Sequence, residues 1–328
     1  MLAKTTQHSQ TSTFLLPPRL LAESGSTRTV GVEIEFTGTS ARKAATTLAD
    51  AGGRLEEEDP HAFHIRNSPL GDLRVELDVR HVHFRRASRL AFAPPQGWAI
   101  RLGDLLSPIV PRELITPPVP MDQLPAVDEL ADLLRRSGAG GCGANAFGSL
   151  GLHFNIDPPD LEPETIVSIV KAFLILEPGL RQEGHGGSLL RRAWQPPKFA
   201  AAYVRKVLAP DYWPNMDGFT RDFLALTPSR NRSLDLLPLL SHFDDARVRA
   251  RLPKEKIGRR PVFHYRLPQA CLARREWSIA PEWNRWVAVE RLAADTDTLE
   301  RLGAEYRRSE NNDAVWRERI APWLSSAD

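Results

Sequence analysis

Cysteine is scarce in this sequence, whose 328 residues include only Cys142 and Cys271. The two cysteines form no CxxC motif, and their number and spacing indicate no disulfide framework. We therefore expect two free thiols that are buried or partly buried, as unpaired cysteines usually are. Free thiols of this kind are typical of a reducing cytoplasm.

Long apolar runs and a strong charge of one sign are also absent. No stretch approaches the roughly 18 apolar residues of a membrane span, and the N-terminal MLAKTTQHSQTSTFLLPPRL lacks a sustained apolar signal core. The 43 Lys and Arg residues nearly balance the 41 Asp and Glu residues. This balance argues against a nucleic-acid binder that depends on a basic surface. We expect a cytoplasmic protein without a membrane or nucleic-acid partner.

The composition changes near residue 26. Residues 1–25 are polar, are rich in Thr, Ser and Gln, and contain Pro17-Pro18, which predicts a flexible N-terminal tail. Residues 26–328 contain no internal repeat and no evident linker, and 42% of the whole chain is hydrophobic. We predict a single domain over 26–328 with a substantial core.

The pattern of apolar residues predicts strands in the first half of the chain and mainly helices in the second. The expected strands are 29–36, 54–58, 62–66, 73–79, 109–117, 150–157 and 260–267. The expected helices are 41–51, 96–107, 121–138, 163–184, 199–208, 217–225, 234–241 and 281–302. Several strands are joined by connections too short for a parallel crossover, which favours an α+β fold with a mainly antiparallel sheet.

The strand in TVGVEIEFTG (Thr29–Gly38) carries two acids on one face. Glu33 and Glu35 are two residues apart, so their side chains project to the same side, while Val32 and Ile34 project to the other. Two close carboxylates repel each other, and burying either of them without a compensating cation is costly. The pair alone is therefore consistent with a solvated strand face, with an ion pair to Arg or Lys, or with bound Mg²⁺ or Mn²⁺.

Three further segments present polar side chains in the same way. In GDLRVELD, Glu76 and Asp78 share a strand face, and Glu113 lies in RELITPP. His153 and Asn155 alternate in GLHFNID. If these strands are neighbours in one sheet, their polar faces form the carboxylate-lined surface that a two-metal phosphate site requires.

Cationic side chains that could face such a surface lie later in the chain. Arg230 and Arg232 occur in TPSRNRSLDLLP, His264 and Arg266 alternate in VFHYRLP, and Lys198 follows two prolines. Arginine is well suited to a phosphate or a substrate carboxylate. An ordinary structural or surface ion pair is the alternative for each of them.

The order and spacing of these segments resemble the amidoligase family. The segments are GVEIEF, GDLRVELD, RELITPP and GLHFNID, followed by TPSRNRSLDLLPL and RPVFHYRLP. The family comprises carboxylate–amine ligases related to glutamine synthetase and glutamate–cysteine ligase. The resemblance implies a glutamine-synthetase-like curved, mainly antiparallel sheet, with helices packed on its outer face and a helical C-terminal half. ATP and Mg²⁺, or Mn²⁺ in its place, would lie on the inner face.

The resemblance also implies roles for individual residues. Metal ligands would be Glu33, Glu35, Glu113 and Glu76. Nucleotide binding would involve His153, Asn155 and Arg266, with Lys198 as a further candidate. Catalysis would involve Arg266, Arg232 and His153.

The activity implied is ATP-dependent formation of an amide through an acyl phosphate, on an amino acid such as glutamate or on a small peptide. Two alternatives stay open at this point. One is a phosphotransferase of the same fold, as in guanidino kinases, and the other is a binding or scaffold protein without turnover.

Overall fold

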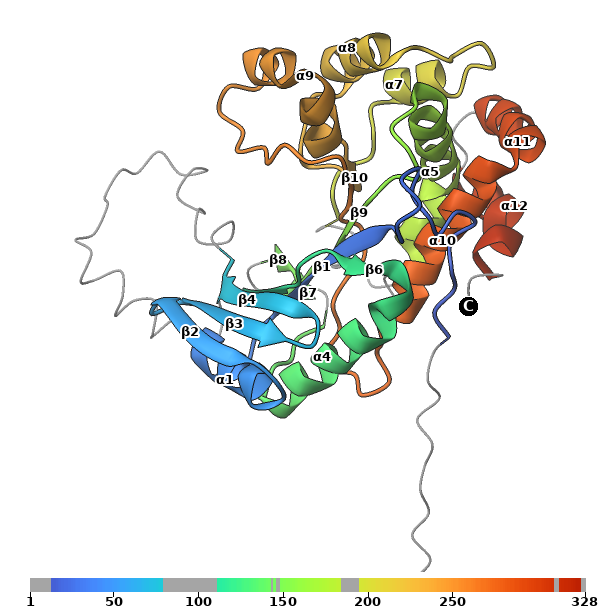
Figure 1. The fold of residues 1–328 in the computed structure, drawn as a ribbon. Helices are drawn as coiled ribbons and strands as arrows, with labels where there is room; N and C mark the ends of the chain where they lie inside the picture. Colours follow the sequence, from blue (N-terminus) through green and yellow to red (C-terminus); the bar gives the residue numbers. More distant parts are fainter. Residues whose placement is uncertain are drawn as a thin grey trace, which may run out of the picture.

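One large open antiparallel sheet organises the protein (Figure 1). The computed structural model describes residues 13–78, 111–142, 144–145, 148–183, 195–309 and 313–325. In sheet order, the strands are β10 (Leu234–Asp235), β11 (Phe263–Tyr265), β9 (Leu152–Ile156), β1 (Thr29–Phe36), β5 (Arg112–Ile115), β4 (Gly71–Leu77), β3 (Ala62–Ser68) and β2 (Arg54–Asp59). The short strand β6 (Val119–Pro120) also pairs with β1, and β7 (Ala144–Asn145) pairs with β8 (Gly148–Ser149). The expected mixed fold around an antiparallel sheet is confirmed.

Helices cover the apolar side of this sheet because the strands alternate. Val32, Ile34 and Phe36 of β1 are fully buried. Two long helices, α5 (Pro163–Glu183) and α10 (Ala280–Ala294), lie against this side of the sheet. Aromatic contacts join the layers: the rings of Phe154 and Trp283 are 5.9 Å apart between centroids. The core is therefore formed by one sheet face and the helices packed on it.

The remaining helices surround these layers (Figure 1). Their bounds are α1 (Ala41–Asp50), α4 (Leu124–Arg136), α7 (Ala201–Val207), α8 (Met216–Leu226), α9 (Leu237–Arg251), α11 (Thr296–Arg308) and α12 (Asp313–Ser325). Ser40 caps α1 by accepting a hydrogen bond from the Lys43 amide. Helices α7, α8 and α9 gather beyond the β10 end of the sheet, whereas α11 and α12 pack beside α5 and α10.

The predicted element boundaries differ from the structure in the second half. The segment expected as a helix over 234–241 begins as strand β10 before α9 starts at Leu237. The helix expected over 281–302 is two helices, because Asp295 leaves helical geometry and its side chain caps α11 by accepting from the Thr298 amide. Helix α12 has no counterpart among the expected elements. The helix expected over 96–107 lies outside the described residues.

The N-terminal segment is tied to the fold over part of the range predicted as a tail. The Leu15 amide donates to the Asn284 side chain, and the Asn284 amide group donates to the Thr13 carbonyl. The Trp283 indole donates to the Leu15 carbonyl at 2.8 Å. The sequence could not reveal these bonds because the partners on α10 are about 270 residues away.

A buried ion pair joins β1 to the helical layer. Arg28, just before β1, makes two bonds to Glu290 of α10, at 2.6 and 2.8 Å, and both side chains are almost fully buried. The guanidinium also donates to the Asp157 and Arg19 carbonyls, and the Trp286 indole donates to Glu290. Every N–H donor of the Arg28 guanidinium thereby has an acceptor. A buried ion pair requires such complete hydrogen bonding.

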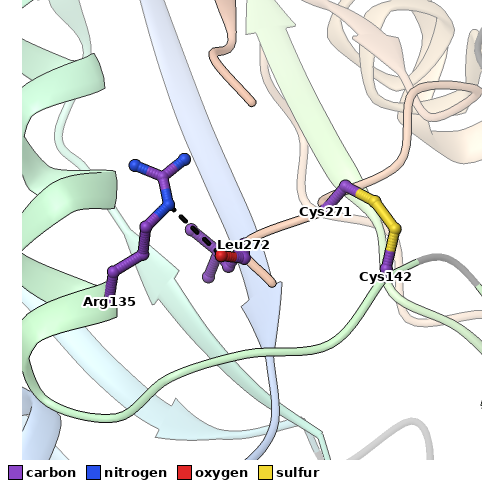
Figure 2. Close-up of a disulfide and its surroundings, with 4 residues drawn as sticks. All are labelled: Arg135, Cys142, Cys271 and Leu272. Carbon is purple, nitrogen blue, oxygen red and sulfur yellow. Dashed lines mark hydrogen bonds between the residues drawn. A yellow bond between two sulfur atoms is a disulfide. The ribbon is translucent and has the colours of Figure 1, made fainter. Parts of the chain in front are cut away.

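The expectation of two free thiols is wrong, because Cys142 and Cys271 are joined by a disulfide (Figure 2). The Ala273 amide donates to the Gly141 carbonyl at 3.1 Å, so the two segments already run side by side at the cysteines. Arg135 of α4 donates to the neighbouring Leu272 carbonyl. The sequence separation of 129 positions conceals this proximity. The pairing removes the thiol argument for a reducing compartment.

No helix among the described residues is long and apolar enough to cross a membrane. Helix α5, which is long and largely apolar, carries a buried lysine. Lys171 is 5% exposed, and its ammonium donates to the Ala209 carbonyl and lies 4.1 Å from the centre of the Trp213 ring. Burial lowers the pKa of Lys171 to about 8, although Glu300 and Asp211 act in the opposite direction.

We expect Arg28→Met to lower the free energy of unfolding by about 3–5 kcal/mol, because it leaves the Glu290 carboxylate buried without its cation. Adding Glu290→Gln should recover part of this loss. Arg301→Met, which removes an exposed pair with Glu305, should cost at most about 1 kcal/mol. Urea denaturation of the variants measures these differences, and equal costs at Arg28 and Arg301 would contradict the assignment.

We also expect a pH effect from Lys171. Its pKa in an unfolded chain is 10.5, so between pH about 8 and 10.5 the unfolded state binds more protons than the folded state. The free energy of unfolding should therefore rise with pH across this window, relative to Lys171→Met. Urea denaturation at a series of pH values tests this, and parallel profiles for the two proteins would refute it.

Candidate metal and phosphate site on the polar sheet face

The polar face of the sheet brings together most of the acids singled out in the sequence. Glu35, Glu113 and Glu76 lie directly opposite one another on β1, β5 and β4. On the other side of β1, Glu33 lies opposite His153 of β9. The sheet order therefore places the predicted polar residues on adjacent strands, as a shared carboxylate surface requires.

Three of these acids form a close group, here called the carboxylate cluster: Glu35, Asp78 and Glu113. Each offers an oxygen, and the three oxygens lie within 4.8 Å of one another. All three residues are buried. Asp78 follows the last residue of β4 and continues the ladder, since its amide donates to the Pro111 carbonyl. Carboxylate oxygens at this spacing are the donors that hard divalent cations prefer.

A second group, here called the imidazole cluster, consists of Glu33, His153 and His264. One donor atom from each also lies within 4.8 Å of the others. The Nδ1 of His153 is 3.1 Å from Oε2 of Glu33, and the Nε2 of His264 is 4.0 Å from the same oxygen. The two clusters adjoin, because the Nε2 of His153 is 4.0 Å from Oε1 of Glu35.

Hydrogen bonds hold both β1 glutamates in place. The Asn155 side-chain amide donates to Oε1 of Glu33 at 2.9 Å. The Gly151 amide donates to Oε2 of Glu35 at 2.7 Å, while the Glu35 amide donates to the Gly151 carbonyl. Each carboxylate therefore has one oxygen fixed by β9 or by Gly151 just before it. The other oxygens, Oε2 of Glu33 and Oε1 of Glu35, lie 3.1 and 4.0 Å from the ring nitrogens of His153.

Gly151 makes room for the His153 ring. A Cβ atom at position 151 would overlap Nε2 of His153 and approach Cε1 to 2.9 Å. Glycine at position 151 is therefore favoured on steric grounds. Any side chain there would displace the His153 imidazole from its place between Glu33 and Glu35.

A buried carboxylate also lies near the Nδ1 atom of His264. Its Nδ1 is 3.8 Å from Oδ2 of Asp235, its partner on β10, and Asp235 is fully buried. Arg230 donates to the same carboxylate at 3.2 Å. Burial raises the pKa of Asp235, and Arg230 and Arg266 offset this in part.

Glu76 lies on the polar face but outside the carboxylate cluster. Its carboxylate pairs with Arg74 on the same strand at 2.7 Å. Burial raises the pKa of Glu76, and Arg74 acts in the opposite direction. The structure brings Asp78, two residues further along the same face, to Glu35 and Glu113.

The predicted cations take different positions. Arg266 follows β11 and its guanidinium donates to the Arg230 carbonyl at 2.9 Å, near Asp235. Arg232 donates to the Thr227 hydroxyl and the Lys198 carbonyl. The Lys198 ammonium pairs with Asp313 of α12 rather than with a carboxylate of the sheet. Of these cations, Arg266 lies beside the imidazole cluster through Asp235.

Sequence reasoning missed Asp78 and His264 as members of the clusters. Both residues fit the alternation of side chains along a strand, since Asp78 shares a face with Glu76, and His264 shares one with Arg266. The missing information was the order of the strands, which puts β11 beside β9 and the end of β4 beside β5.

A cavity of about 200 Å³ lies elsewhere, between the start of α5 and the end of α10. It is lined by Pro18, Arg19, Pro159, Glu164, Thr165, Ser168, Ile169, Glu290, Ala293 and Ala294, and includes no member of either cluster. It is smaller than the roughly 300–1,000 Å³ of typical small-molecule sites. The grouped donor atoms lie instead on the polar face of the sheet.

Comparison with known proteins identifies one family. A family model described as "Putative amidoligase enzyme" matches residues 26–288, which is most of the chain and includes every member of the two clusters. No curated protein and no solved structure matches the chain.

We expect Gly151→Ala to destabilise the protein by about 1–3 kcal/mol, because the new methyl group must displace the His153 ring. The cost should shrink when His153→Ala is already present, since the ring is then gone. Gly258→Ala, at an exposed position with only an ordinary contact, is the control and should be near neutral. Urea denaturation measures all four variants, and an undiminished cost in the His153→Ala background would contradict the steric explanation.

Proposed function

The chain belongs to the amidoligase family, and we propose that it is an ATP- and Mg²⁺-dependent carboxylate–amine ligase that forms an amide bond. The observation that carries this proposal is the carboxylate cluster of Glu35, Asp78 and Glu113, buried on the polar sheet face. A protein that only binds a partner has no evident need for three converging buried acids, whereas phosphoryl transfer from ATP uses divalent cations.

The proposal extends to the fold and to the place of ATP. The open antiparallel sheet would be of the glutamine synthetase type, with the triphosphate over the polar face and helices such as α5 and α10 on the opposite side. Supporting this orientation, the polar face carries both clusters, and Arg266, which directly follows β11, lies near Asp235.

The residues present fit Mg²⁺ at the carboxylate cluster. Mg²⁺ is a hard cation that takes oxygen ligands and usually keeps several waters and phosphate oxygens. Glu35 and Glu113, joined by Asp78 in place of the expected Glu76, supply three carboxylates from different strands. Bound Mg²⁺ would supply positive charge that neutralises the phosphates of ATP.

The chain's own side chains would then hold the reacting groups in line. Glu35 keeps its orientation through the Gly151 amide, which donates to Oε2. Arg266 would stabilise negative charge on the transferred phosphoryl group or hold a substrate carboxylate. The His153 ring, which lies between Glu33 and Glu35, would keep these two carboxylates apart and in position.

The reaction proposed has two steps. First, a carboxylate oxygen of the acid substrate attacks the γ-phosphorus of ATP, and ADP leaves. Second, the amine nitrogen attacks the acyl carbon, inorganic phosphate leaves, and the nitrogen loses a proton. The acid would be an amino acid such as glutamate or a small peptide, by analogy with the family alone.

We expect ATP, Mg²⁺, a library of amino acids and hydroxylamine to give a hydroxamate with this protein, because hydroxylamine traps an acyl phosphate. The measurement is hydroxamate colour together with ADP release. ADP release without hydroxamate would instead indicate a phosphotransferase. Calorimetry without Mg²⁺-dependent ATP binding would indicate a binding or scaffold protein.

Glu35→Gln is the matched test of the site. The amide keeps the acceptor for the Gly151 N–H but removes one charge from the cluster. We expect loss of ATP turnover with an unchanged or higher melting temperature, since three close carboxylates repel one another. Glu58→Gln, on exposed β2, should retain activity. Full turnover by Glu35→Gln would place the metal site elsewhere.

A further inference from the structure

The disulfide between Cys142 and Cys271 (Figure 2) joins two segments that also hold the start of β9. On the Cys271 side, Gln269 and Gly151 form an antiparallel bridge, with backbone hydrogen bonds of 3.0 and 3.1 Å on either side of it. Gly151 in turn donates its amide to the Glu35 carboxylate. The disulfide is therefore two residues from a backbone bridge whose other member fixes an acid of the carboxylate cluster.

The segment on the other side of the disulfide reaches β1. Gly140 forms an antiparallel bridge with Thr37, the residue after β1. The Ala273 amide donates to the Gly141 carbonyl at 3.1 Å. Gly141 also lies close to Leu150, since a Cβ atom at position 141 would be 2.2 Å from Cδ1 of Leu150. The disulfide thus ties together the segments that lie beside the end of β1 and the start of β9.

Backbone bridges are the only other backbone connection recorded between these described segments, and they are isolated bridges rather than a long ladder. Gly138 and Gly141 have φ angles of 91° and 101°, and glycine gains more conformational freedom on release than any other residue. Short hydrogen-bonded connections of this kind open locally with a small cost in free energy, whereas a covalent bond does not. Loss of the disulfide should therefore increase local opening at Gly151.

We propose that this disulfide is a reversible redox switch for the polar-face site, opened by an external dithiol and acting on Glu35 through Gly151. The oxidised form holds Gly151 and Glu35 in the geometry described above. The reduced form opens there more often and binds Mg²⁺ and ATP more weakly. The effect on ATP rests on the proposed function, whereas the effect on Gly151 and Glu35 does not.

The exchange begins at Cys142, which is partly exposed, whereas Cys271 is 7% exposed. A thiolate of the dithiol attacks Sγ of Cys142, the S–S bond breaks, and the Cys271 sulfur leaves as a thiolate and takes a proton. The second thiolate of the reductant then displaces the Cys142 sulfur, which also takes a proton. The protein gains two electrons and two protons, and the dithiol becomes a cyclic disulfide.

Hydrogen exchange measured by mass spectrometry tests the switch without ATP or any acid substrate. The oxidised protein is compared with the protein reduced by dithiothreitol, and alkylation verifies the number of thiols. We expect faster exchange on reduction in peptides that cover Glu35 and Gly151, unchanged exchange in α11, and recovery after reoxidation. Circular dichroism should show that both forms are folded.

The chain contains only these two cysteines, so a matched control is available. The double variant Cys142→Ser, Cys271→Ser should exchange like the reduced wild type. It should also give the same result with and without dithiothreitol, because no disulfide remains for the reductant to act on.

Calorimetry with Mg²⁺ and ATP measures the effect on the site. We expect the reduced protein to bind ATP more weakly by about 5-fold or more, as is typical of coupled sites. Linkage requires the reverse effect to be equal in size. Saturating Mg²⁺ and ATP should therefore raise, by the same factor, the ratio of reduced to oxidised dithiothreitol at which half of the protein is reduced.

The switch is overturned if excess dithiothreitol leaves the disulfide of the folded protein intact, or if reduction unfolds the whole chain. It is also overturned if exchange at Glu35 and Gly151 does not respond to reduction, or if both forms bind ATP with equal affinity. If neither form binds ATP while exchange responds to reduction, the ligase proposal fails and the redox effect on Gly151 and Glu35 stands.

Discussion

The alternation of side chains along β1 is the constraint on which the rest of the structure depends. Val32, Ile34 and Phe36 are fully buried under the helices, so Glu33 and Glu35 must project from the opposite face. A register shift of one residue would exchange the two sets and place both carboxylates in an apolar core. The packing of α5 and α10 on one face therefore determines the chemistry of the other.

The position of β1 in the middle of the sheet separates its two glutamates chemically. On one side, Glu33 meets imidazoles from β9 and β11; on the other, Glu35 meets carboxylates from β5 and the end of β4. Two residues that are neighbours on a strand thereby belong to groups of different donor type. One sheet face therefore carries a mixed nitrogen and oxygen group beside an all-oxygen group.

The site needs rigid support, because the side chains of a functional site must be held within about half an ångström. The buried pair of Arg28 and Glu290 joins the start of β1 and the end of β9 to α10. The disulfide joins the segment after α4 to the segment after β11. These two connections involve residues far apart in the sequence, and both lie close to strands that carry the clusters.

Local pattern was enough to predict the β1 strand, the α1 helix and the antiparallel character of the sheet, because alternation, capping and short connections are properties of neighbouring residues. It was also enough to put Glu33 with Glu35, and His153 with Asn155, on common strand faces. Resemblance to the amidoligase family came from the order of these same segments, and the family match over 26–288 agrees with it.

The tertiary structure alone decided which of these faces meet. It placed β11 beside β9, so that His264 joins Glu33 and His153, and it selected Asp78 rather than Glu76 as the third acid. It also paired two cysteines that the sequence presented as isolated thiols. The physical reason is the same in each case: strand order and register arise from packing between distant segments, and no local pattern specifies which distant segment becomes the neighbour.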